Sequence, residues 1–199
     1  MSPPGAGKSV LASHMVDQLR QHGEYVLLYF FYKESDLRTQ SNTEMLACLI
    51  AQLLDHGHEL DRFIGILKAS VDSRAYYDDR GRTYDQLLAT LRDLIAGYGK
   101  TIVIILDALD ECPEHGIIAQ LMPEIAGPNV RICLTGRVEV HELFSSMKST
   151  VTVRMSVIED IRKYITEKVE EDKALRMYRE DIIKTANKNS KGMFRYAGR

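Results

Sequence analysis

The sequence predicts an α/β fold, a three-layer sandwich with a mostly parallel sheet and a C-terminal helical extension. Three observations lead to this prediction. A glycine-rich segment with a lysine opens a helix, a continuous apolar run ends in acidic residues, and strands alternate with helices along the chain. Because such a fold gathers loops at the carboxyl ends of its strands, a binding site is expected there.

Residues 4–9 read Pro-Gly-Ala-Gly-Lys-Ser and are typical of a P-loop, a phosphate-binding loop. Glycines let backbone N–H groups approach a polyphosphate, the lysine adds a positive charge, and the hydroxyl of Ser9 is expected to bind Mg²⁺. The full pattern has a glycine where Ser2 stands, and a simple helix cap is the alternative interpretation. The candidate nucleotide-binding residues are Pro4, Gly5, Ala6, Gly7, Lys8, Ser9 and Val10.

The first half of the chain alternates helix and strand. Apolar residues at helical spacing predict a helix over 8–22, and an aromatic and aliphatic run predicts a strand over 24–32. Asn42 or Thr43 is expected to cap a second helix that reaches residue 54, followed by a short helix at 58–69 and a polar loop at 72–83. The apolar residues of the first helix are Val10, Leu11, Met15, Val16 and Leu19.

Residues 101–106 form a β-branched run that predicts a strand buried on both faces. Acidic residues follow it directly. Asp107 is placed to hold Mg²⁺ opposite Ser9, which is the Walker B role, and Asp110 and Glu111 are candidates to orient an attacking water. The alternative is a solvated loop after a core strand, and the glycine-rich loop upstream favours the site.

The second half predicts helices at 84–96 and 115–126, strands at 130–134 and 150–155, and two charged helices within 157–190. Arg137 follows the strand at 130–134. It either contacts the γ-phosphate as a third catalytic residue or serves as a surface or helix-cap residue, and Arg38 is a weaker candidate of the same kind. The predicted division is a nucleotide-binding core at 1–156 and the start of a helical subdomain at 157–199.

Composition narrows the function classes. With 199 residues, 45% of them hydrophobic, the chain suffices for one α/β domain and a small helical appendage. A formal net charge of −2 gives no overall basic field for nucleic acid or an anionic membrane, and no run is long and apolar enough to span a bilayer. We expect a cytoplasmic protein whose three cysteines are buried free thiols.

Six segments in order resemble the NACHT-type nucleotide-binding domains of the signal-transduction NTPases, in their fungal and nephrocystin-like N-terminal subgroup. The segments are residues 4–12, 29–32, 105–112, 133–137, 158–165 and 190–197. The resemblance implies a switch that binds ATP or GTP with Mg²⁺, hydrolyses it slowly and self-associates through this domain. It also implies an effector domain, a repeat sensor domain and a role in intracellular nonself recognition.

The chain departs from this family at its start. The family's first strand ends at the glycine that Ser2 replaces, so the sequence predicts a sheet without that strand and a truncated domain. The runner-up hypothesis is therefore a scaffold or interaction fragment with a vestigial nucleotide site. A small-molecule or nucleotide kinase is a third option, and it would require a basic acceptor pocket or lid where the sequence has only scattered arginines.

Overall fold

The computed structural model describes residues 7–56, 65, 84–137, 144, 151–153 and 158–190, without the side chains of 158 and 187–190. In this part of the chain β1 (Val26–Phe31), β2 (Ile102–Asp107) and β3 (Val130–Leu134) form a parallel sheet in the order β1-β2-β3. Val26 pairs with Ile102, and Ile102 pairs with Val130. The strand with the continuous apolar run is therefore central, as its sequence predicts.

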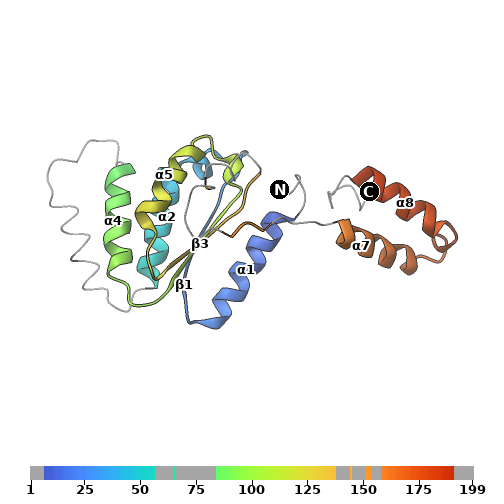
Figure 1. Cartoon of the computed structure of the whole chain (residues 1–199), viewed down its shortest axis with the longest axis horizontal. Coiled ribbons are helices and arrows are strands. Elements are labelled where there is room, and N and C mark those ends of the chain that lie inside the picture. The colour runs from blue at the N-terminus through green and yellow to red at the C-terminus, as the bar shows by residue number, and fades with distance from the viewer. Residues whose placement is uncertain are drawn as a thin grey trace. The chain divides into compact units, whose positions relative to one another are not determined.

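Helices cover both faces of the sheet (Figure 1). One face carries α2 (Asn42–Asp55), α4 (Tyr84–Ala96) and α5 (His115–Ile125), and α1 (Lys8–His22) lies on the other. Two short 3-10 helices, η1 (Leu37–Gln40) and η2 (Leu109–Glu111), follow β1 and β2. The prediction of an α/β sandwich with a parallel sheet is confirmed.

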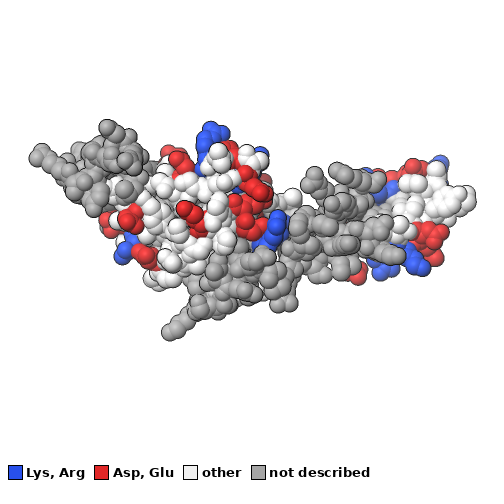
Figure 2. All heavy atoms as spheres, turned by 90° about the horizontal axis from the view of Figure 1, so that it is seen from above, with Lys and Arg blue, Asp and Glu red and all other residues white. Residues whose placement is uncertain are grey.

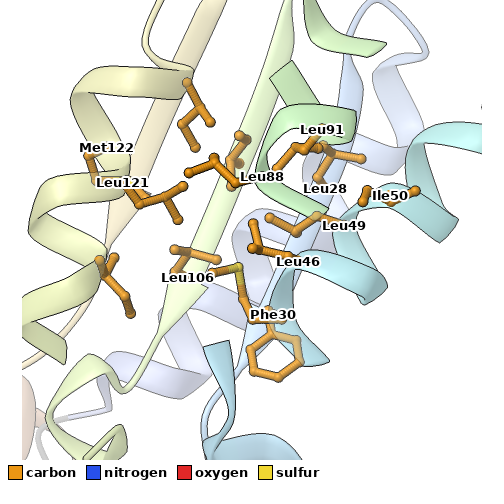
Figure 3. Close-up of a cluster of buried hydrophobic side chains, with 14 of the residues drawn as sticks. Leu28, Phe30, Leu46, Leu49, Ile50, Leu88, Leu91, Leu106, Leu121 and Met122 are labelled. Carbon is orange, nitrogen blue, oxygen red and sulfur yellow. The ribbon is translucent and has the colours of Figure 1, made fainter. Parts of the chain in front are cut away.

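Alternating side chains of the strands supply the two cores. Leu28, Phe30 and Leu106 face the three-helix side, where they meet leucines and other apolar residues of α2, α4 and α5 (Figure 3). Leu27 and Ile105 face the other side and pack with Ala12 and Val16 of α1. Burial on both faces explains why β2 needs an unbroken apolar sequence.

The inward face of α1 differs from the predicted one. Val10 is 74% exposed and Leu11 is also exposed, so these two residues do not belong to the buried stripe. Ala12 and Val16, one turn apart, make the contact with the sheet, and Met15 and Leu19 flank them. A small alanine at the centre of this stripe allows the helix backbone to approach the strands closely.

Several boundaries shift by a few residues. β1 starts two residues later than predicted, and the N-cap of α2 is Ser41, whose Oγ accepts from the N–H of Thr43 at 3.2 Å and of Glu44 at 3.4 Å. Asparagine is as strong an N-cap residue as serine, but the Asn42 side chain is buried and bonds Tyr32 and the Glu114 carbonyl, so Ser41 supplies the cap. The predicted helix at 58–69 lies outside the described residues except Gly65, which is helical, and the loop at 72–83 lies outside them entirely.

The strand predicted at 150–155 is not found where the structure describes it. Residues 151–153 have no strand conformation, and Val151 and Val153 are 86% and 79% exposed. An alternating pattern becomes a strand only when a neighbouring strand accepts its hydrogen bonds, and no ladder partner is present for these three residues.

The predicted charged helices are present as α7 (Ile158–Glu171) and α8 (Arg179–Ser190), joined through η3 (Arg176–Tyr178). They have a small core of their own, in which Ile161, Ile165 and Val169 of α7 meet Ile182 and Ile183 of α8. By internal contacts the chain divides into Leu11–Lys148 and a second unit of Met1–Val10 with Ser149–Arg199. The predicted division at residue 156 stays a prediction.

Candidate functional site

The carboxyl ends of the three strands bring together polar side chains from distant parts of the sequence. Asp107, the last residue of β2, is only 2% exposed, and its Oδ1 accepts a hydrogen bond from the Thr135 hydroxyl just after β3. Its backbone oxygen accepts from the N–H of Tyr32 at 3.1 Å. Burying a carboxylate this deeply costs free energy unless hydrogen-bond partners compensate for the lost water. The burial of Asp107 therefore depends on these partners.

The backbone turns sharply directly after Asp107. Ala108 has φ 57° and ψ 46°, a left-handed conformation that is unfavourable for residues with a Cβ. Thr135 holds this turn, because its Oγ1 accepts from the Ala108 N–H at 3.0 Å and its backbone oxygen accepts from the Leu109 N–H, also at 3.0 Å. Such strain is typical of functional loops, where the surrounding structure fixes an otherwise rare conformation.

Asp110 and Arg137 form an ion pair in this loop region. The Nε atom of Arg137 lies 2.8 Å from Asp110 Oδ2, and the Arg137 backbone N–H donates to Asp110 Oδ1 at 3.1 Å. The Asp110 side chain is 12% exposed and that of Arg137 is 52% exposed. The two candidate residues thus lie side by side, and the carboxylate fixes the start of the segment after β3.

Glu111 connects two loops. Its Oε2 accepts from the backbone N–H of Glu34 at 2.8 Å, which ties η2 to the segment after β1. Arg38, the weaker arginine candidate, pairs instead with its neighbour Asp36 at 3.3 Å and has a strongly exposed side chain. Hydrogen bonds from Arg38 lower the pKa of Asp36, and the pair stays local to η1.

A buried polar network lies beneath these loops. The Tyr32 hydroxyl donates to Asn42 Oδ1 at 3.0 Å, the Cys112 thiol donates to the same oxygen at 3.4 Å, and Asn42 Nδ2 donates to the Glu114 carbonyl at 3.2 Å. Burial raises the pKa of the Cys112 thiol and of the Tyr32 hydroxyl. All three cysteines are free, with Cys112 buried and Cys48 and Cys133 partly buried, so the burial prediction is confirmed for Cys112 alone.

Four of the predicted phosphate-loop residues are described. Gly7 has φ +85°, a conformation suited to glycine, and α1 begins at the next residue, Lys8. Ser9 and Val10 lie in the exposed first turn of that helix. The remaining candidates, Pro4, Gly5 and Ala6, lie outside the described residues.

Sequence reasoning missed two residues of the site. Thr135 bonds Asp107 and the turn after it, whereas the sequence alone indicates only Arg137 as a candidate in that segment. The sequence does contain one signal for Thr135: it is a hydroxyl residue that directly follows the strand predicted beside the acidic strand. The sequence predicts Asn42 only as a candidate helix cap, and nothing in it indicates that the Asn42 amide is buried.

Surface charge is mixed in sign. On the face shown in Figure 2, acidic and basic side chains are interspersed over the described surface, in keeping with the formal net charge of −2. None of the helices in the described ranges is both long and apolar enough to cross a membrane.

The fold and the strand-end residues define the class of this molecule: a parallel α/β protein with helices on both faces of its sheet and a buried acid at the end of the central strand. Residues 1–137 match the family model described as Nephrocystin 3, N-terminal. Because the match spans well over half of the 199 residues, the chain belongs to this family. No curated protein sequence matches the chain.

Proposed function

We propose that this chain is a NACHT-type nucleotide switch that binds ATP or GTP with Mg²⁺ and hydrolyses it slowly. The single observation that carries the proposal is the buried Asp107 carboxylate at the end of the central parallel strand. Ligands of open α/β sheets bind at this edge, and an acid there is the usual partner of a nucleotide-bound metal. The membership in the nephrocystin-like family supports the same function.

The phosphate-binding role falls to Gly5, Gly7, Lys8 and Ser9. Gly7 has the positive φ that a tight loop in front of a helix requires, and α1 begins directly after it. A helix N-terminus presents unpaired N–H groups and a partial positive charge to an anion. Lys8 adds a full charge, which is why its removal is the sharpest single test of this role.

The oxygen-bearing side chains of Asp107 and Ser9 suit a Mg²⁺ ion that is bound together with a nucleotide. The described part of the chain has no group of three or more His, Cys, Asp or Glu side chains arranged to hold a metal. Mg²⁺ commonly takes one or two protein oxygens and completes its shell with phosphates and water. Asp107 and the Ser9 hydroxyl would supply those oxygens, and the bound ion would neutralise phosphate charge.

Asp110, Glu111 and Arg137 are proposed for hydrolysis, and each has a protein partner in this structure. Arg137 uses Nε for Asp110, and its guanidinium carries further N–H donors at the terminal nitrogens for a phosphate. Glu111 would have to exchange its bond from the Glu34 N–H in order to orient water. These existing partners favour slow turnover.

The same pairings support a second candidate function, a scaffold fragment with a vestigial nucleotide site. If Asp110 and Glu111 serve only to fix loops, the protein would bind nucleotide weakly or not at all and would not hydrolyse it. In either case we propose that the domain works in the cytoplasm, self-associates, and is joined to effector and repeat sensor domains. Phosphate release, measured with and without Glu111→Gln, separates the two candidates.

Nucleotide binding is tested by titrating the protein with a fluorescent ATP or GTP analogue, with and without Mg²⁺. Lys8→Ala is expected to raise the Kd about 10- to 100-fold, because it removes a charged hydrogen-bond donor. Asp107→Asn is expected to abolish the Mg²⁺ dependence. Lys100→Ala, at an exposed lysine before β2 at the opposite end of the sheet, is the matched control. Binding that Lys8→Ala leaves unchanged would overturn the proposal.

A further inference from the structure

A cavity of about 410 Å³ lies at the amino ends of the strands, at the opposite end of the sheet from Asp107. Its lining residues come from the ends of α1, α2 and α4, from the start of β1 and from the segment before β2. The Val26 N–H donates to the Thr101 carbonyl at 2.9 Å, which joins the start of β1 to the segment that leads into β2. The cavity has the size of a small-molecule site.

The walls of this amino-end cavity are apolar and its rim is basic. Leu19, Val26 and Leu27 line the interior together with the partly buried ring of Tyr98. Arg20, His56 and Lys100 are exposed and line the same cavity from three different segments. No aspartate or glutamate is among the described residues that line it, so the rim carries net positive charge at neutral pH.

Two of the rim residues are held in place by uncharged partners. The Arg20 guanidinium carbon lies 5.0 Å from the centre of the Tyr29 ring, and the guanidinium also donates to the Tyr29 hydroxyl. His56 Nε2 lies 3.2 Å from the Leu27 carbonyl oxygen. Because that oxygen only accepts, Nε2 is the donor. These contacts orient both side chains, and neither the Tyr29 ring nor the Leu27 carbonyl carries a negative charge.

We propose that the amino-end cavity binds a small organic anion, with an apolar or aromatic body against Leu19, Val26 and Leu27 and an acidic group at Arg20 and Lys100. The apolar interior favours a hydrocarbon body by removing it from water. The basic rim favours an anion over a neutral or cationic analogue. The inference rests on a cavity that the proposed nucleotide site does not use, so the two can fail separately.

The test uses isothermal titration calorimetry with three probes of one shape: 4-phenylbutyrate, 4-phenylbutanol and 4-phenylbutylamine. We expect the acid to bind at one site, the alcohol more weakly and the amine most weakly. Added salt should weaken the acid far more than the alcohol, because it screens exposed charges. Acetate serves as a simple anion, and it should not displace the acid at equal concentration.

Three variants locate the site. Lys100→Gln and Arg20→Gln should each raise the Kd of phenylbutyrate roughly two- to fivefold and leave that of the alcohol unchanged. Gly99→Phe should weaken both probes, since Gly99 lines the cavity and a Cβ there meets no atom within 4 Å, which leaves room for a ring at the cavity wall. Lys33→Gln, which removes an exposed lysine after the other end of β1, is the matched control.

The outcomes separate the alternatives. Selective binding of the acid that depends on Lys100 and Arg20 supports the proposal. Equal affinities for acid and alcohol would mean a merely apolar cavity, and equal effects of Lys33→Gln and Lys100→Gln would mean a general charge effect. Either result, or no heat with millimolar phenylbutyrate, overturns the proposal. Circular dichroism checks that the Gly99→Phe variant is folded. If this variant is not folded, the Lys100→Gln and Arg20→Gln variants decide whether the proposal holds.

Discussion

At the scale of single residues, the strand-end site depends on one unusual backbone conformation. Ala108 is the only residue other than glycine with a positive φ among those the structure describes. It turns the chain so that Asp107 stays buried while Asp110 and Glu111 reach other loops. Thr135 holds the turn from the neighbouring strand. A β-branched residue at this position would meet a strong steric penalty.

Replacing Ala108 tests this strain directly. We expect Ala108→Val to lower the free energy of unfolding by about 2 kcal/mol, because a branched Cβ adds a steric cost to the one that alanine already has in a left-handed conformation. Ala108→Gly should lie within about 1 kcal/mol of wild type, since glycine tolerates the conformation but is more flexible when unfolded. Urea denaturation measures both. Equal losses for valine and glycine would contradict the role of φ.

The buried thiol predicts how stability depends on pH. Burial raises the pKa of Cys112 above its ordinary value of 9.0, so the folded state holds this proton more tightly than the unfolded state. The stability is therefore complete below about pH 9 and falls as pH rises through the folded pKa. Urea denaturation from pH 7 to 10 should show the decrease, and Cys112→Ala should make it less steep. Parallel curves would show that another group titrates.

At the scale of elements, the loops after β1 and β2 are tied together and to the start of α2. The network of Tyr32, Asn42 and Cys112 forms one connection, and the bond between Glu111 and the Glu34 N–H forms another. Asn42 also reaches the Glu114 carbonyl just before α5. A shift of any one loop would therefore disturb the others.

Removal of the Asn42 amide should be costly. Asn42→Ala leaves the buried hydroxyl of Tyr32 and the Glu114 carbonyl without this partner, and each such group costs about 1–3 kcal/mol. We expect a loss of at least about 2 kcal/mol in the free energy of unfolding. Asn129→Ala, at an exposed asparagine in the turn before β3, should change it by less than about 0.5 kcal/mol. Similar losses for both would rule out the network as the cause.

At the scale of the whole molecule, the chain contains two compact units with separate cores. The larger unit has the sheet sandwiched between helices, with a strand-end site and an amino-end cavity at opposite ends. The α7–α8 pair has a small core of five isoleucines and valines with one alanine, so it buries far less apolar surface than the larger unit.

Mutation of the small core should leave the large one intact. Ile161 is fully buried in α7, and Ile161→Ala is expected to destabilise the α7–α8 pair by about 2–5 kcal/mol. Hydrogen exchange should then accelerate in α7 and α8 while the strands keep their protection. Val153→Ala, at an exposed position, is the control. Faster exchange in β2 would mean that the two units unfold together.

The sequence by itself determined the elements with strong periodicity: α1, α4, the central strand β2, β3 and the pair α7–α8. It also singled out Asp107, because an acid after an unbroken apolar run marks a strand end. Only the tertiary structure decided that Thr135 bonds Asp107, that Arg137 pairs with Asp110, and that three helix ends enclose a basic-rimmed cavity. Local sequence specifies local periodicity, whereas these contacts join residues far apart in the chain and exist only once the strands are side by side.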